Sequence, residues 1–156
     1  MPLSEPSRAS EPFRFTTKLS LRELTGLKAK NLQELLGLIE TVPDSVIYHH
    51  THHFLQQHQF LIPEPPNDFA YWVREVLGEK ELAEKLASIN TVEFSTIREL
   101  REKIAAAIHK YMEKRKGVMR EASEGNEFYF LKSVSFVFPT PYEAHSLEEF
   151  FSILKN

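Results

Sequence analysis

Apolar and polar side chains alternate at both ends of the chain. The first alternating stretch, 13–21, carries its apolar side chains at odd-numbered positions: Phe13, Phe15, Leu19 and Leu21. The same period of two returns over 128–138. Because successive side chains of a strand point to opposite faces, this period predicts two half-buried strands.

Between and after these strands, apolar residues recur every three or four positions, which predicts helices. Capping pairs mark three of the helix starts: Asn31 with Glu34, Thr96 with Glu99, and Ser146 with Glu149. The expected helices span 31–40, 41–59, 69–77, 79–88, 96–117 and 146–154. The sequence therefore predicts an α+β fold that is mainly helical, with five to six helices and a small sheet formed by two strand–loop–helix repeats.

The two repeats are similar in sequence at a constant offset. Residues 13–39 align with 128–154 without a gap and share seven identities in 27 positions. Strand, cap and helix positions keep their roles, so we expect a duplicated unit with a pseudo-twofold axis. The loops expected at 22–30 and 137–145 would then face one another. A generic strand followed by a capped helix would also match, and that alternative stays open.

The expected organisation is a leader followed by one domain. Residues 1–12 are rich in Pro, Ser and Glu, and they cannot repay their ordering entropy by burial, so a flexible leader is expected there. Residues 13–156 should form a single globular domain, with repeat units 13–40 and 128–155 on either side of a helical middle.

Composition narrows the classes of function. The formal net charge is -3, which does not fit the clustered positive charge of a general nucleic-acid binder. The chain has no cysteine, which excludes disulfides, thiolate metal sites and a cysteine nucleophile. No apolar run is long enough to span a membrane, and no signal peptide is recognisable. We therefore expect a cytoplasmic protein that binds neither nucleic acid nor membrane.

The densest chemical signal is a histidine-rich stretch, 48–58, on the second expected helix. Helical spacing places His50 and His58 on the inward face, while His49 and His53 lie four residues apart, where two imidazoles can reach one metal ion. The stretch lacks the general-base Glu of an H-E-x-x-H motif. Metal binding, buried hydrogen bonding and acid–base catalysis stay open as roles of these histidines. Metal binding would need a third ligand, for which His145, Glu143 or Glu64 is available.

Other candidate residues lie in and near the repeats. Arg22 and Lys28 precede the first repeat helix, where basic side chains beside free amides can hold a small anionic ligand, although surface charge is the commoner meaning. The second copy offers Tyr142 and His145 in the matching places. Lys132 interrupts the apolar stripe of its strand, which indicates either an edge position or a functional lysine. Exposed strand edges also leave a homodimer open.

Three strings resemble a known family. Residues 48–58, 64–73 and 133–150 are similar to an uncharacterised bacterial domain family of unknown function. The resemblance implies a compact bacterial cytosolic domain and no activity, cofactor or catalytic residue. The leading hypothesis is a ligand-binding or protein-interaction domain. The alternative is a small histidine-based hydrolase or lyase, with or without a metal, so the sequence leaves open whether the protein is an enzyme.

Overall fold

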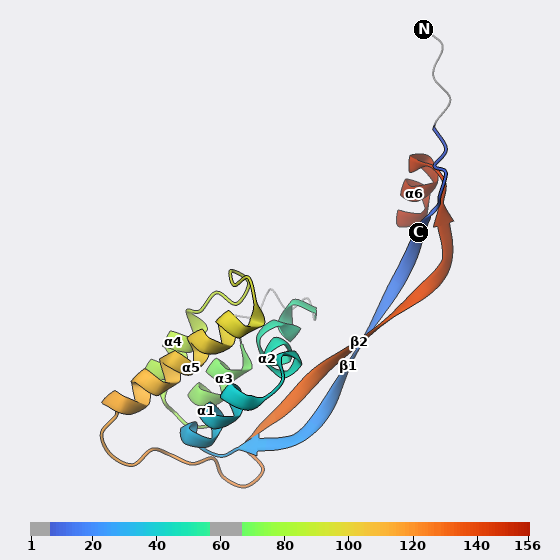
Figure 1. Ribbon diagram of the computed structural model, residues 1–156. Coiled ribbons are helices and arrows are strands. Elements are labelled where there is room, and N and C mark those ends of the chain that lie inside the picture. Colours follow the sequence, from blue (N-terminus) through green and yellow to red (C-terminus); the bar gives the residue numbers. More distant parts are fainter. Residues whose placement is uncertain (1–6, 57–66) are drawn as a thin grey trace. The chain divides into compact units, whose positions relative to one another are not determined.

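The computed structural model describes residues 7–56 and 67–156 (Figure 1). In these parts of the chain the elements follow one another in this order: β1 (Phe13–Ala29), α1 (Leu32–Thr41), α2 (Asp44–Gln56), α3 (Asp68–Glu75), α4 (Lys80–Ala87), α5 (Ile97–Lys114), β2 (Phe128–Ala144) and α6 (Leu147–Leu154). The predicted α+β class, mainly helical with a sheet of two strands, is confirmed. No helix within these residues is long and apolar enough to cross a membrane.

The chain forms two compact units. Unit 1 consists of Met1–Leu21 and Ser135–Asn156, and unit 2 is Arg22–Val134. Each strand therefore contributes one part to each unit, and α6 is the helix of unit 1, whereas α1 to α5 belong to unit 2. The single domain expected over 13–156 stays a prediction.

The strands are longer than expected. The stretches 22–29 and 137–144, which we expected to be loops, continue β1 and β2 as strand. Thr25 donates its hydroxyl to the Phe130 carbonyl, and Thr140 donates to the Phe15 carbonyl, so paired positions follow one another in opposite directions along β1 and β2, as in an antiparallel pair. A strand of a two-stranded sheet has a free edge, so the Gly and Pro residues that broke the sequence pattern are tolerated there.

Equivalent residues of the two copies make equivalent local contacts. The Thr25 hydroxyl accepts a hydrogen bond from the Leu27 amide, and the Thr140 hydroxyl accepts one from Tyr142. Helices α1 and α6 both begin with the predicted capping box, in which the side chains of Asn31 and Ser146 accept a hydrogen bond from the amide three residues later. The sequence similarity therefore extends to hydrogen bonds of the strand, the cap and the first helical turn.

Unit 2 holds the hydrophobic core. Within it α1 packs against α5, α2 against α3 and α5, and α4 against α3 and α5 (Figure 1). The fully buried side chains come from every helix of the unit and from its strand segments; they include Leu32, Leu35, Ile39, Ile47, Phe69, Leu82, Leu86, Leu100, Ile104, Ile108 and Phe130. The apolar stripe of α1 is thus covered by the helices that follow it in the chain.

Candidate functional site

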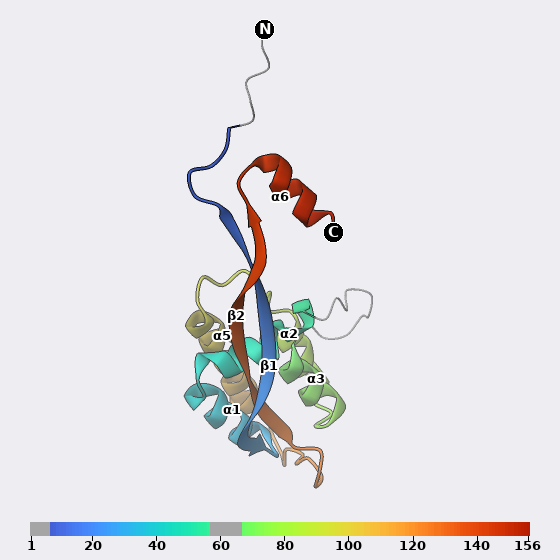
Figure 2. The same cartoon turned by 90° about the vertical axis from the view of Figure 1, so that its right-hand side faces the viewer.

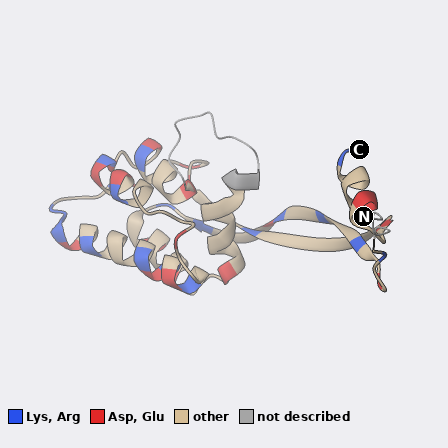
Figure 3. Cartoon of the chain, turned by 90° about the horizontal axis from the view of Figure 1, so that it is seen from above, with Lys and Arg blue, Asp and Glu red and all other residues tan. Residues whose placement is uncertain are grey.

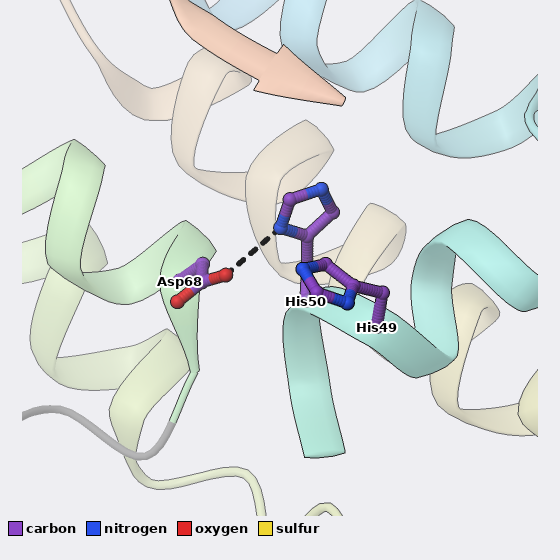
Figure 4. A group of neighbouring side chains, drawn as sticks. All are labelled: His49, His50 and Asp68. Atoms are coloured by element: carbon purple, nitrogen blue, oxygen red, sulfur yellow. Dashed lines mark hydrogen bonds and ion pairs between the residues drawn. The ribbon is translucent and has the colours of Figure 1, made fainter. Parts of the chain in front are cut away.

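The first candidate site is the group of histidines on α2. His50 is buried, and its tautomer follows from its two partners. The Leu131 amide donates to Nε2 of His50 at 2.9 Å, so Nε2 carries no proton, and Nδ1–H donates to Oδ2 of Asp68 at 2.8 Å (Figure 4). Asn67 caps α3, which places Asp68 in its first turn. His50 therefore links α2, α3 and β2.

His49 and His53 complete this group. Nδ1 of His49 lies 3.0 Å from the Ser133 hydroxyl, and Nδ1 of His53 donates to the His49 carbonyl at 2.8 Å. Nδ1 of His53 also lies 3.4 Å from Oδ2 of Asp68. Burial, together with the neighbouring imidazoles of His50 and His53, lowers the pKa of His49 to about 4. His49 is therefore neutral at physiological pH.

The group has some of the properties of a metal site. One ligand atom each from His49, His50 and Asp68 lies within 4.8 Å of the others. Metal binding would require His50 to release its Nδ1 proton while Nε2 still accepts from the Leu131 amide, which leaves an imidazolate. A buried hydrogen-bond network explains the same contacts without that cost. The predicted pair of metal ligands, His49 and His53, stays a prediction.

The sequence did not identify Asp68 as a partner of the histidines. The capping residue before it was recognisable, but proximity to α2 depends on tertiary packing. Of the third ligands considered, His145 and Glu143 belong to unit 1, whereas the histidines of α2 belong to unit 2. Glu64 lies outside the described residues, as does His58.

Two of the three charged candidates of unit 2 have acidic partners. Nζ of Lys132 lies 3.4 Å from Glu23, and Nζ of Lys28 lies 3.9 Å from Glu127. Arg22 is exposed. Two cavities of about 660 and 620 Å³ lie along α5, and His49, His50 and Asp68 line neither of them. These two cavities therefore bring none of Arg22, Lys28 and Lys132 together with His49, His50 or Asp68.

The second candidate site is an apolar surface in unit 1, which we name the α6 face. It consists of Phe13 of β1 and of one stripe of α6, namely Leu147, Phe150, Phe151 and Leu154. Phe150 is partly buried because its ring packs against Phe13 and Phe15, with centroids 5.1 and 5.2 Å away. The other members of the face are exposed. Figure 2 shows α6 directly after β2 in this unit.

The α6 face and its equivalent in unit 2 are both apolar, but their side chains differ strongly in exposure. Leu147 is 76% exposed, whereas Leu32 is 0% exposed; Leu154 is 59% exposed, whereas Ile39 is 0% exposed. Phe13 is 56% exposed and its equivalent Phe128 is 5% exposed. The two residues of each pair are both apolar, so the difference in exposure comes from what packs on them.

The remaining candidates lie beside this face. Tyr142 is exposed, and the His145 carbonyl accepts a hydrogen bond from the Ala9 amide at 2.7 Å. A groove of about 730 Å³ runs along the N-terminal segment and the start of α6, where Phe13, His145 and Leu147 contribute to its lining. In Figure 3 the strands and α6 in unit 1 are mostly uncharged, whereas charges are interspersed over the helices of unit 2. The α6 face therefore suits an apolar partner.

Comparisons with known proteins give a family and a fold relative. The model of a family of unknown function (DUF5752) matches residues 10–156. No curated protein matches this chain. A solved structure of OrfY from Thermoproteus tenax matches with a TM-score of 0.73 and 32% sequence identity, and the match covers 96% of this chain and 66% of that chain. The predicted resemblance to a family of unknown function is confirmed, and a bacterial origin stays a prediction.

Proposed function

We propose that this chain, which belongs to the DUF5752 family of unknown function, is a protein-interaction domain that docks a partner on the α6 face of unit 1. One observation carries the proposal. Side chains that are buried in unit 2 have equivalents in unit 1 that are exposed, as the pair Leu32 and Leu147 shows.

The geometry of the exposed side chains suits a protein partner. Leu147, Phe151 and Leu154 follow at i, i+4 and i+7, so they form one stripe along α6. Contiguous exposed apolar surface of this kind marks interaction sites, and a helical stripe with this spacing is a common way to anchor a partner. Aromatic side chains such as Phe151 contribute large contact areas when they are buried at an interface.

A metal-dependent enzyme is the second candidate. It rests on the three ligand atoms of His49, His50 and Asp68 that lie within 4.8 Å of one another. It is the weaker candidate because both ring nitrogens of His50 already have hydrogen-bond partners. The α6 face needs no such rearrangement before it can bind.

Photo-crosslinking followed by binding measurements tests the docking function. A photoreactive phenylalanine replaces Phe151 in one variant and Ser152, on the polar side of α6, in a matched control. We expect one protein to be crosslinked at position 151 and not at 152. The purified partner should then bind the Phe151→Asp variant at least about 30-fold more weakly than the Ser152→Asp variant, as for an interface hot spot.

Three results would contradict the proposed function. No capture of a protein at position 151 would leave the α6 face without a partner. Equal affinity of the partner for the Phe151→Asp and Ser152→Asp variants would show that the α6 face does not bind it. If position 151 crosslinks only to further copies of this chain, the α6 face mediates self-association and does not bind a partner protein.

A further inference from the structure

We infer that the occupant of the α6 face is a helical bundle of the same type as α2–α5, an inference that rests on the proposed function. In unit 2 a helical bundle covers the surface that is equivalent to the α6 face. Leu32, Leu35 and Ile39 of α1 share one core with side chains from the four helices α2, α3, α4 and α5. The α6 stripe carries large apolar side chains at all the equivalent positions.

The segments that lead into the two strands make similar contacts in the two units. In unit 2 the segment that leads into β2 pairs with the end of β1, where the Ala122 amide donates to the Lys30 carbonyl at 2.7 Å. In unit 1 the segment that leads into β1 makes a contact with the equivalent acceptor, where the Ala9 amide donates to the His145 carbonyl at 2.7 Å. Lys30 and His145 are equivalent positions. Unit 1 thus has the same strand, cap, helix and incoming segment as unit 2, and it differs in the bundle.

The solved relative OrfY is longer than the part that matches this chain. The match to OrfY leaves a third of that chain uncovered, a length about half that of the matched part. Residues 42–127, which contain α2–α5, make up slightly more than half of this chain. The unmatched part of OrfY is therefore of the size that one further bundle needs.

A second copy of this chain is a poorer occupant. Its own α2–α5 bundle is already packed in its own unit 2, so it has no free bundle to offer from the residues that the structure describes. Phe150 and Phe151 stand where α1 has Leu35 and Leu36, so a fitting bundle needs smaller side chains opposite them. The occupant is therefore a bundle with an aliphatic, small-residue face, in the manner of α5 with its Ala105 and Ala107 beside Ile104 and Ile108.

An extended protein tests this inference. Asn156 is equivalent to Thr41, so a second copy of residues 42–127 added directly after Asn156 continues the repeat in register. We expect the added copy to fold on the α6 face and the extended protein to be monomeric. Hydrogen exchange of the α6 amides should slow at least about tenfold relative to the original chain. A matched control carries the same extension with Leu147→Asp and Leu154→Asp, and it should show no such protection.

A second version of the extended protein removes the difference in side-chain size between α6 and α1. In it Phe150→Leu and Phe151→Leu make the stripe equal to that of α1 at these two positions. If neither version protects α6 beyond its Asp control, the inference is overturned. If the extended protein self-associates through α6 while the added copy stays unfolded, it is also overturned. A captured partner without a helical bundle would overturn this inference alone, whereas no capture at position 151 would overturn the proposed function.

Discussion

Truncation of two equivalent leucines should have very different costs. Leu32 and Leu147 are each the first residue of a helix after the capping residue, so replacement by Ala changes helix propensity equally in both. Leu32 is fully buried in the core of unit 2, and Leu→Ala at such a site costs about 2 to 5 kcal/mol because a cavity remains. Leu147 is 76% exposed, so Leu147→Ala should cost about 0.5 kcal/mol or less.

Urea unfolding measures both costs. Far-UV circular dichroism reports the helices of both units, and fluorescence of the single Trp72, which is buried in unit 2, reports the core separately. We expect Leu32→Ala to lower the unfolding midpoint strongly and Leu147→Ala to leave it nearly unchanged. Equal losses for the two variants would refute the reasoning, because they would mean that the α6 face is already buried in the isolated chain.

Three further predictions concern the histidines. Burial lowers the pKa of His49 to about 4 from an ordinary value of 6.5, so the unfolded chain binds a proton between these values that the folded chain does not. Stability should therefore fall by up to about 3 kcal/mol as pH drops from 6.5 to 4, and His49→Gln should flatten this slope. His50→Ala should cost about 2 to 4 kcal/mol in chemical unfolding, because it removes the partners of the Leu131 amide and Asp68; a loss below about 0.5 kcal/mol would contradict the linking role. Elemental analysis of purified protein should find less than one equivalent of divalent metal, and a full equivalent that is lost in His49→Ala would favour the metal-dependent alternative.

Local chemistry in the sequence was sufficient to predict three of the helix starts, whereas α2 begins at Asp44 and not at 41. The capping boxes at Asn31, Thr96 and Ser146 all form, because each depends only on residues within one turn. The strand ends were not predictable in the same way. Residues 22–29 and 137–144 lose the alternating pattern through Gly and Pro, and their strand conformation depends on pairing with the other strand.

The candidate sites depended on tertiary contacts that the sequence does not contain. The spacing of His49 and His53 was visible, whereas the bond from His50 to Asp68 joins two helices. Lys132 was open to two readings, and the structure places it beside Glu23. The apolar stripes of α1 and α6 are similar in sequence, so the pattern predicts which side of each helix is apolar but not what packs on it.

Thiol labelling of single-cysteine variants tests the central claim most directly, because the chain has no cysteine of its own. The account predicts that Leu147→Cys reacts as a freely exposed thiol and at least about 1,000-fold faster than Leu32→Cys, whose reaction requires opening of the core. In the protein extended by a second copy of residues 42–127, the reaction at position 147 should slow at least about tenfold. Labelling of Leu147→Cys as slow as that of Leu32→Cys in the original chain, or an unchanged rate after extension both with and without Phe150→Leu and Phe151→Leu, would contradict the account.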